Sequence, residues 1–384
     1  MEALFTKIDE LFPIYKQFWK DIVAIETPSR NREQMAKMVN AVYAFAESRG
    51  FKVTRHPDLG MGEMLTVETV TESKKQPFTF MGHMDTVHPM GLFGPEVVRE
   101  EDGKLYGPGA VDCKGGLVCA MLTMEALTAC GYQERPLKLI MTPDEEISSP
   151  TSREFIKEQN RGSAALFNCE TGTEGKLVTG RKGIYKIKVE VTGKASHAGN
   201  DYFGGTSAIR ECCLKILTIE GLSQEGGTTF NCGVIQGGTV SNVVAEKCWF
   251  EVDIRAVTQE AMDDAVQKVC SIAEHCTLKG AVGKAILPER YRPPFAPNMG
   301  TDLLFERIRA VGHHYGIEEL TAMQPGGGSD IVFAAQVGVP GVCSIGVCGT
   351  GTHSVREVAD IASLTRRAKL MGATIKDFAH ALEY

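Results

Sequence analysis

Several short apolar segments of the chain end in side chains that can bind a metal ion. The first, "FTFM" at 78–81, runs through one glycine into a histidine and, two residues later, an aspartate. Two further apolar segments end in glutamates, and another aspartate stands just before a Gly-Gly pair that can begin a helix. The side chains concerned are His83, Asp85, Asp112, Glu145, Glu146 and Glu170.

These residue types indicate hydrolytic metal chemistry. Imidazole and carboxylate ligands without thiolates are typical of sites that hold Zn²⁺, Mn²⁺ or Co²⁺. One ion takes three or four protein ligands and this set offers more, so we expect two ions, ~3.5–4 Å apart and bridged by one carboxylate. Each motif alone has an ordinary explanation as a turn, a solvated Glu-Glu corner or a helix N-cap. Their recurrence at successive segment ends in an apolar context favours a shared site.

The segments that carry these residues indicate buried strands of an α/β fold. Segments 78–81, 137–141 and 164–168 are brief and are bounded by polar or glycine-containing turns. Segment 115–131, rich in Leu, Met and Ala, lies between the first two and suits a buried helix. This spacing predicts a mostly parallel sheet flanked by helices. Because the carboxyl ends of parallel strands share one edge, the polar groups can converge on a single cleft.

The pattern changes near residue 183, where alternation of apolar and polar residues indicates a strand with one wet face. The elements that follow have the order β-α-β-β-α-β of a ferredoxin-like unit. We therefore predict an inserted α+β domain at 183–294, which interrupts a catalytic domain made of 1–182 and 295–384. The elements expected in the insert are strands at 184–193, 228–237, 245–257 and 283–288 and helices at 206–221 and 258–276. Those expected after it are helices at 301–315 and 363–382 and a strand at 341–346.

Composition excludes several classes of partner. The net charge is −7 and no basic run occurs, which argues against a nucleic acid or an anionic membrane as partner. The first thirty residues carry charges every few positions, unlike a signal peptide, and no window approaches the roughly 18–20 apolar residues of a membrane span. The twelve cysteines are scattered without a CxxC pair, as expected for reduced thiols. Together these observations favour a cytoplasmic protein.

Eight motifs occur in the order and approximate spacing of a known family: "GHMDTV", "YGPGAVDCKGG", "PDEE", "CETG", "ASHAG", "NVV…DIR", "GGGSD" and "GTHS". Over nearly its whole length the chain resembles the dinuclear zinc exopeptidases and deacylases, which include bacterial glutamate carboxypeptidase, aminoacylase and acetylornithine deacetylase. Its motifs are most similar to those of the glutamate carboxypeptidases. The resemblance implies that Asp112 bridges two zinc ions, for which cobalt or manganese can substitute. His83 and Glu170 would complete one site, and Glu146 and His353 the other.

The resemblance also implies roles around the metals. Asp85 would orient the His83 ring. Glu145, outside the ligand set, would act as general base toward a water held between the metals and pass the proton to the leaving nitrogen. His197 of the "SHAG" motif would reach the partner subunit's active site and stabilise the oxyanion, which implies a homodimer formed through the inserted domain; the residues alone favour a turn histidine. Family members have a cis peptide bond after the bridging aspartate, here Asp112–Cys113.

Substrate contacts are expected from the second half of the chain. Arg255 would bind a substrate carboxylate through its guanidinium, and the alternative from the residues alone is an internal ion pair with Glu251 or Asp253. An asparagine matches the same family pattern as this arginine, and the glycines of the "PGGGSD" loop suit close backbone approach to the substrate's terminus. These further candidates are Asn242, Gly327 and Gly328.

The motifs together predict a zinc-dependent metallohydrolase that cleaves an amide bond next to a free carboxylate in a small peptide or an N-acyl amino acid. A glutamate at the position of Glu170 is typical of the family's carboxypeptidases and deacylases, whereas its aminopeptidases tend to have aspartate. A carboxypeptidase is the first hypothesis and an N-acyl-amino-acid deacylase the second. A catalytically silent binding protein would show gaps in the ligand set, and we find none. A dinucleotide-binding enzyme lacks support, because no GxGxxG follows the first strand.

Overall fold

The computed structural model describes residues 1–289, 291–296 and 298–378. The chain divides into two compact units. Unit 1 comprises Met1–Thr179, Pro297–Gln324 and Ser329–Tyr384, and unit 2 comprises Gly180–Ala296 and Pro325–Gly328. The second unit therefore takes in four residues of the glycine loop, which the sequence pattern assigns to the domain that resumes after the insert.

Unit 1 is built on an eight-stranded sheet of order β1-β2-β6-β3-β7-β14-β8-β13. Its centre is parallel: β3 pairs with both β6 and β7, and β7 pairs with β14 in the same direction. The β1–β2 ribbon joins β6 antiparallel. This confirms the mostly parallel sheet. The strands are β1 Lys52–His56, β2 Met64–Glu68, β3 Phe78–His83, β6 Leu137–Thr142, β7 Ala165–Asn168, β8 Lys176–Val178, β13 Thr321–Met323 and β14 Gly341–Cys343.

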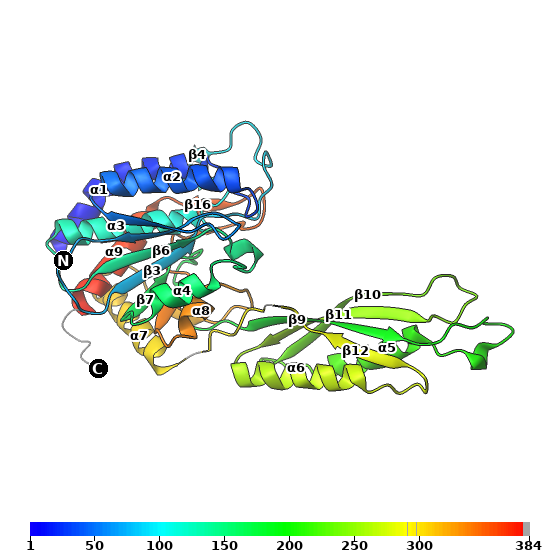
Figure 1. The fold of residues 1–384 in the computed structure, drawn as a ribbon. Helices are drawn as coiled ribbons and strands as arrows, with labels where there is room; N and C mark the ends of the chain where they lie inside the picture. The colour runs from blue at the N-terminus through cyan, green and yellow to red at the C-terminus, as the bar shows by residue number, and fades with distance from the viewer. Residues whose placement is uncertain (290, 297, 379–384) are drawn as a thin grey trace. The chain divides into compact units, whose positions relative to one another are not determined.

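Helices cover both sides of this sheet, which explains why every residue of the central strands β3 and β7 is buried. Figure 1 shows α1, α2 and α3 on one side of the strands and α4 and α8 on the other. The helices are α1 Glu2–Val23, α2 Arg32–Ser48, α3 Lys114–Ala129, α4 Arg153–Asn160, α7 Met299–His314, α8 Ile331–Ala335 and α9 Ala362–Phe378. Residues 379–382, the end of the expected last helix, lie outside the described residues.

The start of α3 is pressed against the end of β7, and glycines make this possible. A Cβ added to Gly116 would lie 1.8 Å from the carbonyl oxygen of Cys169, and one added to Gly115 would lie 2.5 Å from that of Ala110. These separations are far shorter than a van der Waals contact and the atoms met are backbone atoms. Any larger residue would therefore push the helix away from the sheet. The close approach brings the loop before α3, with its aspartate, to the strand end that carries Glu170.

A small antiparallel sheet of order β15-β16-β5-β4 completes unit 1. It pairs β16, after the predicted ligand His353, with β5, which precedes the loop of Asp112. Two ligand-bearing segments far apart in sequence are thus joined by main-chain hydrogen bonds. Its strands are β4 Arg99–Glu101, β5 Lys104–Tyr106, β15 Gly349–Thr350 and β16 Val358–Asp360. Within the described residues, no helix combines the length and apolar composition that a membrane span requires.

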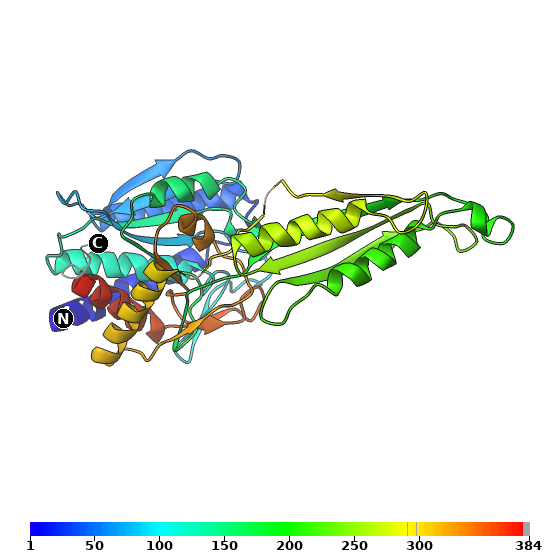
Figure 2. The same cartoon turned by 90° about the horizontal axis from the view of Figure 1, so that it is seen from below.

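Unit 2 is a four-stranded antiparallel sheet of order β10-β11-β9-β12, the order of a ferredoxin-like fold. Figure 2 shows α5 and α6 lying side by side on one face of it. The α6 helix begins as predicted, with the Thr258 side chain accepting a hydrogen bond from the Ala261 N–H. The elements are β9 Gly183–Thr192, α5 Ala208–Glu220, β10 Thr229–Gly237, β11 Lys247–Ala256, α6 Gln259–Glu274 and β12 Val282–Ile286.

Candidate metal centre

The parallel register of three central strands sets predicted ligands side by side. His83 pairs with Thr142 across β3 and β6, and Met81 pairs with Asn168 across β3 and β7. The three strands therefore end at one edge of the sheet. His83 is the last residue of β3, Glu146 follows β6 within a short 3₁₀ turn, Glu145–Ile147, and Glu170 lies just beyond β7.

The first cluster of ligand atoms surrounds the buried ring of His83, which is 1 % exposed. Its Nε2 atom lies 3.3 Å from Asp112 Oδ1 and 3.7 Å from Glu170 Oε2. These are separations at which one cation can sit among the three atoms. The sequence-predicted set of His83, Asp112 and Glu170 is thus brought together within unit 1.

A second cluster lies on the other oxygen of the same aspartate. His353 Nε2 is 3.4 Å from Asp112 Oδ2 and 3.3 Å from Glu146 Oε2. The His353 side chain is 59 % exposed, whereas that of Glu146 is 6 % exposed, so this cluster opens to solvent on the histidine side. Asp112 therefore directs one oxygen to each cluster, which is the geometry of a bridging carboxylate.

Electrostatics shows that this group of side chains requires positive charge. Hydrogen bonds to Asp112 and Glu146 raise the pKa of His353 to about 10. Burial raises the pKa of Glu146 to about 7. Burial also disfavours charge on Asp112, but hydrogen bonds from His353 and His83 outweigh it and hold the pKa of Asp112 well below its usual value. Two divalent cations bound to neutral imidazoles would supply the charge that protonated histidines supply here, so the residues fit a metal pair.

Asp85 lies beside the first cluster and contacts the ring of His83. It is fully buried, with Oδ1 3.3 Å from His83 Nδ1, although the carbonyl oxygen of Asp85 lies nearer to that nitrogen, at 3.0 Å. Its carboxylate also accepts the backbone N–H groups of Glu145 and Glu146, each at 3.1 Å, and the hydroxyl of Ser29 at 2.7 Å. One carboxylate thus connects a ligand histidine to the turn that carries the candidate general base.

Two serines at the site were not found by sequence reasoning. Ser29 follows a proline in "ETPSR" with no local signal. Ser329 donates its hydroxyl to Glu170 Oε1 at 3.2 Å and accepts the side-chain amide of Asn168 at 2.7 Å. Ser329 belongs to the "PGGGSD" motif, in which only the glycines suggest a role from the sequence. The motif therefore also supplies a hydrogen bond to a metal-binding carboxylate.

Cys113 lies directly beneath the first cluster. The Asp112–Cys113 peptide bond is cis, as the family resemblance implies. The Cys113 sulfur accepts the His83 N–H at 3.0 Å, and it lies with His83 and Glu170 in a group whose ligand atoms could hold a metal. Burial raises the pKa of this thiol to about 12, so it remains protonated near neutral pH in the metal-free site.

Arg255 is engaged within unit 2. Its Nε and Nη2 atoms donate to the two oxygens of Asp253 at 2.5 and 3.1 Å, and Nη1 donates to the carbonyl of Gly326 at 3.0 Å. The internal ion pair named as the alternative is therefore present. Binding of a substrate carboxylate by Arg255 stays a prediction. The next carbonyl of the glycine loop, that of Gly327, accepts Nη1 of Arg181 at 3.0 Å, and Gly328 lies against the side chain of Arg292.

His197 is exposed on unit 2 with its ring fixed by backbone donors. Its Nδ1 accepts the N–H groups of Gly199 and Asn200, each at 3.1 Å, so the proton of a neutral ring lies on Nε2. Nε2 is then a donor, as an oxyanion contact requires. Asn242 lies close to His197 along the paired backbones, because the Asn242 carbonyl accepts the N–H of Ala198 at 3.0 Å.

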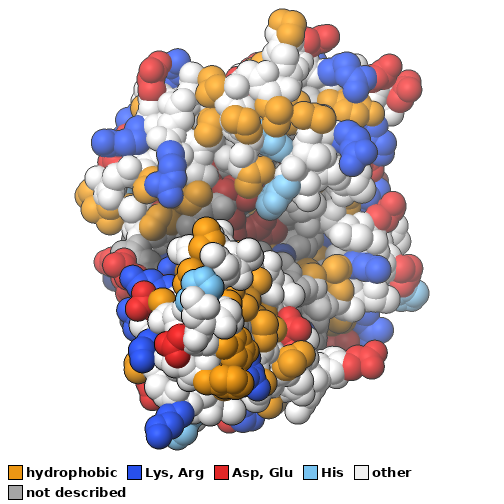
Figure 3. Space-filling view, turned by 90° about the vertical axis from the view of Figure 1, so that its right-hand side faces the viewer, with side chains coloured by type: hydrophobic (Ala, Val, Ile, Leu, Met, Phe, Trp, Pro, Cys, Tyr) orange, Lys and Arg blue, Asp and Glu red, His pale blue; other side chains and the backbone are white. Residues whose placement is uncertain are grey.

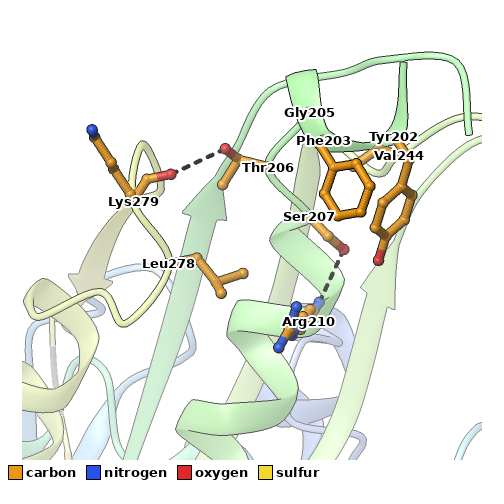
Figure 4. A pocket seen from close by; sticks show the side chains of 9 residues that line it. All are labelled: Tyr202, Phe203, Gly205, Thr206, Ser207, Arg210, Val244, Leu278 and Lys279. Carbon is orange, nitrogen blue, oxygen red and sulfur yellow. Dashed lines mark hydrogen bonds between the residues drawn. The ribbon is translucent and has the colours of Figure 1, made fainter. Parts of the chain in front are cut away.

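A pocket in unit 2 opens at the start of α5 (Figure 4). The rings of Tyr202 and Phe203 stand on its rim, with centroids 5.3 Å apart in an edge-to-face arrangement. Arg210 and Lys279 add positive charge, and none of the predicted site residues lines it. This pocket therefore has no ligand set for a metal. Its complete lining is Tyr202, Phe203, Gly205, Thr206, Ser207, Arg210, Val244, Leu278 and Lys279.

Comparison with known families identifies the family of the chain. The model of Peptidase family M20/M25/M40 matches residues 79–377, which is most of the chain and includes every predicted metal ligand. The chain belongs to peptidase family M20/M25/M40. This confirms the resemblance drawn from the eight motifs, and this M20/M25/M40 peptidase is accordingly a hydrolase.

Individual relatives span the length of this M20/M25/M40 peptidase. Carboxypeptidase G2 of Pseudomonas sp. (strain RS-16) is 30% identical over 98% of this chain and 92% of its own. Acetylornithine deacetylase of Myxococcus xanthus is 28% identical over 65% of this chain and 69% of its own. The crystal structure of aminopeptidase PepT from Bacillus cereus ATCC 10987 superposes with a TM-score of 0.81 at 21% identity, covering 95% of this chain and 98% of that one. This last similarity shows the shared fold.

Proposed function

We propose that the protein is a zinc-dependent carboxypeptidase that hydrolyses an amide bond next to a free carboxylate. The observation that carries the proposal is the placement of Asp112, with one oxygen in each of two clusters that contain a histidine and a glutamate. The similarity to Carboxypeptidase G2 over nearly the whole of both chains supports the choice among peptidases. A glutamate at position 170 supports it as well, since the family's aminopeptidases tend to have aspartate there.

The proposed centre holds two divalent ions, zinc with cobalt or manganese as substitutes. His83, Asp112 and Glu170 would hold one ion, and Asp112, Glu146 and His353 the other. When bound, such ions polarise a substrate carbonyl and lower the pKa of water. The chain's own contribution is to fix the ligands: Asp85 holds the turn of Glu145 and Glu146, and Ser329 donates a hydrogen bond to the carboxylate of Glu170.

Glu145 is proposed as the general base. It precedes the ligand Glu146 in the same 3₁₀ turn, is 7 % exposed, and its N–H is held by the Asp85 carboxylate. A carboxylate fixed beside the metal ligands can accept a proton from the attacking water and deliver it to the leaving nitrogen. His197 would donate its Nε2 proton to the developing oxyanion, and Arg255 would exchange part of its Asp253 contact for a substrate carboxylate.

A panel of substrates tests the reaction class. The zinc-loaded protein is expected to release the C-terminal amino acid from N-acyl amino acids and dipeptides and to leave the matching C-terminal amides intact. Varying the acyl half and the amino acid half in turn separates a peptidase from an N-acyl-amino-acid deacylase, which the similarity to acetylornithine deacetylase favours as second candidate. Failure to cleave any of the panel at full metal occupancy would support a silent binding protein instead.

We further propose a homodimer formed through unit 2. Strand β10 is an edge strand, and its adjacent residues Val234 and Ile235 are both exposed. Leu217 on α5, which packs on β10, is also exposed, and Phe203, in the short 3₁₀ turn before α5, is 97 % exposed. Figure 3 shows apolar side chains gathered on part of the surface that faces the viewer. An exposed edge with apolar side chains is a template for pairing with another chain, and a second copy of this chain brings the same edge.

Light scattering after size exclusion is expected to give the mass of two chains. Ile235→Lys places a charge on the edge strand and is expected to yield monomers, whereas Val282→Lys, on the opposite edge strand β12, is a matched control that leaves the dimer intact. A monomeric parent protein, or two variants with equal mass, would contradict the proposed interface. The described residues include all twelve cysteines and contain no disulfide bond, which supports a reducing compartment such as the cytoplasm.

A further inference from the structure

One buried carboxylate in unit 1 collects four hydrogen bonds that the proposed reaction does not use. Glu357 is 1 % exposed. Its Oε1 accepts the N–H groups of Val111 and Asp112, each at 3.0 Å, and its Oε2 accepts the N–H of Gly109 at 3.1 Å. The fourth partner is His88, whose Nε2 lies 2.8 Å from Oε2. Because the three backbone groups can only donate, the carboxylate is held as an acceptor on both oxygens.

His88 is buried with this carboxylate and acts as its fourth donor. The ring is 3 % exposed and lies edge-to-face against Phe93, with centroids 5.0 Å apart. Facing a carboxylate that already accepts three N–H groups, Nε2 must carry the proton. His88 belongs to the stretch "GHMDTVHP" that also contains His83 and Asp85, but neither His88 nor Glu357 is in the predicted ligand set.

The four contacts join three segments that each supply a metal ligand. His88 follows His83 in the loop after β3, and the three backbone donors belong to the loop that ends in Asp112. Glu357 itself follows His353 in a tight loop, where the Ser354 N–H bonds to Gly351 and the Glu357 N–H bonds to Ser354. These three loops carry a ligand of the first cluster, the bridging ligand and a ligand of the second cluster.

We propose that Glu357, with His88 as a hydrogen-bond donor to it, is a positioning residue. It fixes the position of the bridging Asp112 between the two ligand histidines before any metal binds. The proposal rests on the proposed metal centre. It adds an explanation of how the ligands of the two clusters are held at fixed positions relative to one another. Glu357 fixes the main chain of Asp112 directly through its N–H. Only a side chain with two acceptor oxygens can serve four donors at once, so neither an amide nor an apolar residue can replace it.

Binding of Co²⁺ alone to the full-length protein tests this role. In Glu357→Gln the amide offers one acceptor oxygen and turns an NH₂ group toward N–H donors. We expect its dissociation constant for Co²⁺, measured by competition with a chelator, to rise about 10- to 100-fold, as is typical when a residue behind a metal ligand is lost. The visible absorption bands of bound Co²⁺ should change as well, because the geometry of Asp112 is altered.

His88 variants give a second, milder comparison. In His88→Gln the side-chain NH₂ can still donate to Glu357, so Co²⁺ affinity is expected to stay within about threefold of the parent. In His88→Leu no donor remains, and the affinity is expected to fall about tenfold. Rescue by the donor-bearing variant separates positioning from mere filling of the buried space, and it decides the question should Glu357→Gln fail to fold.

Glu318→Gln is the matched control for a general loss of folding stability. Glu318 is also a buried carboxylate of unit 1; it accepts the Gly175 N–H at 2.7 Å and pairs with Arg367 at 3.3 Å. The Glu318→Gln variant should have a lower Tm than the parent and an unchanged Co²⁺ spectrum. Unchanged Co²⁺ affinity and spectrum in Glu357→Gln, equal weakening by Glu318→Gln, or equal affinities of the two His88 variants would each overturn the proposal. No substrate enters these measurements, so a parent protein that binds Co²⁺ but hydrolyses nothing contradicts only the proposed function.

Discussion

Replacing Glu145 with glutamine is expected to lower kcat by about 10²- to 10⁴-fold while both metal ions remain bound, because the amide cannot accept a proton. The change is nearly isosteric, and the hydrogen bond from the backbone N–H of this residue to Asp85 does not involve the altered side chain. KM should therefore change little. Steady-state kinetics on the best substrate of the panel, with metal content measured on the same sample, provides the test.

Glu154→Gln serves as the control for this substitution. The Glu154 side chain is 84% exposed and pairs with Lys157 on the surface of α4, so its loss should leave kcat unchanged. A Glu145→Gln protein that keeps its metals and hydrolyses at the parental rate would remove Glu145 from the mechanism. A protein that loses its metals would show instead that Glu145 acts in building the site.

The elements that the sequence predicts well include the central strands of unit 1, whose burial is nearly uniform. Strands β3, β6 and β7 form brief apolar runs because helices cover both faces, and such runs are visible without knowledge of the fold. By contrast, α1 was not predicted. Its buried side chains recur every three or four residues, but Pro13 lies inside the helix and charged residues fill its outer face. The short strands β15 and β16 depend on pairing with partners distant in the sequence, which no local pattern records.

Strand ends were also harder to place than strands. The segment 341–346 was predicted as a strand, yet β14 ends at Cys343. The next residue, Ser344, has a left-handed φ of 62° that breaks the extended backbone. A serine gives no local warning of this conformation, since glycine is the residue usually found there. The turn lets the chain leave the sheet at the edge where the ligands gather.

Site residues could be predicted where they follow a predictable strand directly. They could not be predicted where their contacts join distant parts of the chain. His83, Glu146 and Glu170 follow predictable strands directly, so their convergence follows from the parallel sheet. His353 could not be distinguished by spacing from His313 or His314, and only the motif resemblance selected it. In the structure His313 lies in the last turn of α7 and pairs with exposed Glu319. The supporting contacts of Ser329, His88 and Glu357 link residues far apart in the chain and depend on tertiary structure alone.

Removing the metals with a chelator is expected to abolish hydrolysis and to lower the Tm, and adding Zn²⁺ or Co²⁺ should restore both. The loss of activity follows because Glu145 alone provides no polarisation of the carbonyl. The loss of stability follows because ligands that bind only the folded state stabilise it, by about 4 kcal/mol at a thousandfold excess over Kd. Calorimetry of the metal-loaded and chelated protein gives the second effect, and full activity after dialysis to zero metal content would contradict the centre.

Metal binding should also release protons, because a protonated histidine in the site must become neutral to bind the metal. In the metal-free protein the pKa of His353 is raised to about 10 by its carboxylate neighbours, so its ring is protonated near neutral pH. A histidine must be neutral to bind a metal, hence binding expels that proton. Affinity is therefore expected to weaken as the pH falls, by about tenfold per pH unit for each proton released.

Titration calorimetry of Zn²⁺ in two buffers of different ionisation enthalpy counts the protons directly. A count of zero at neutral pH would contradict the combination of a raised pKa and a metal-ligand role for His353.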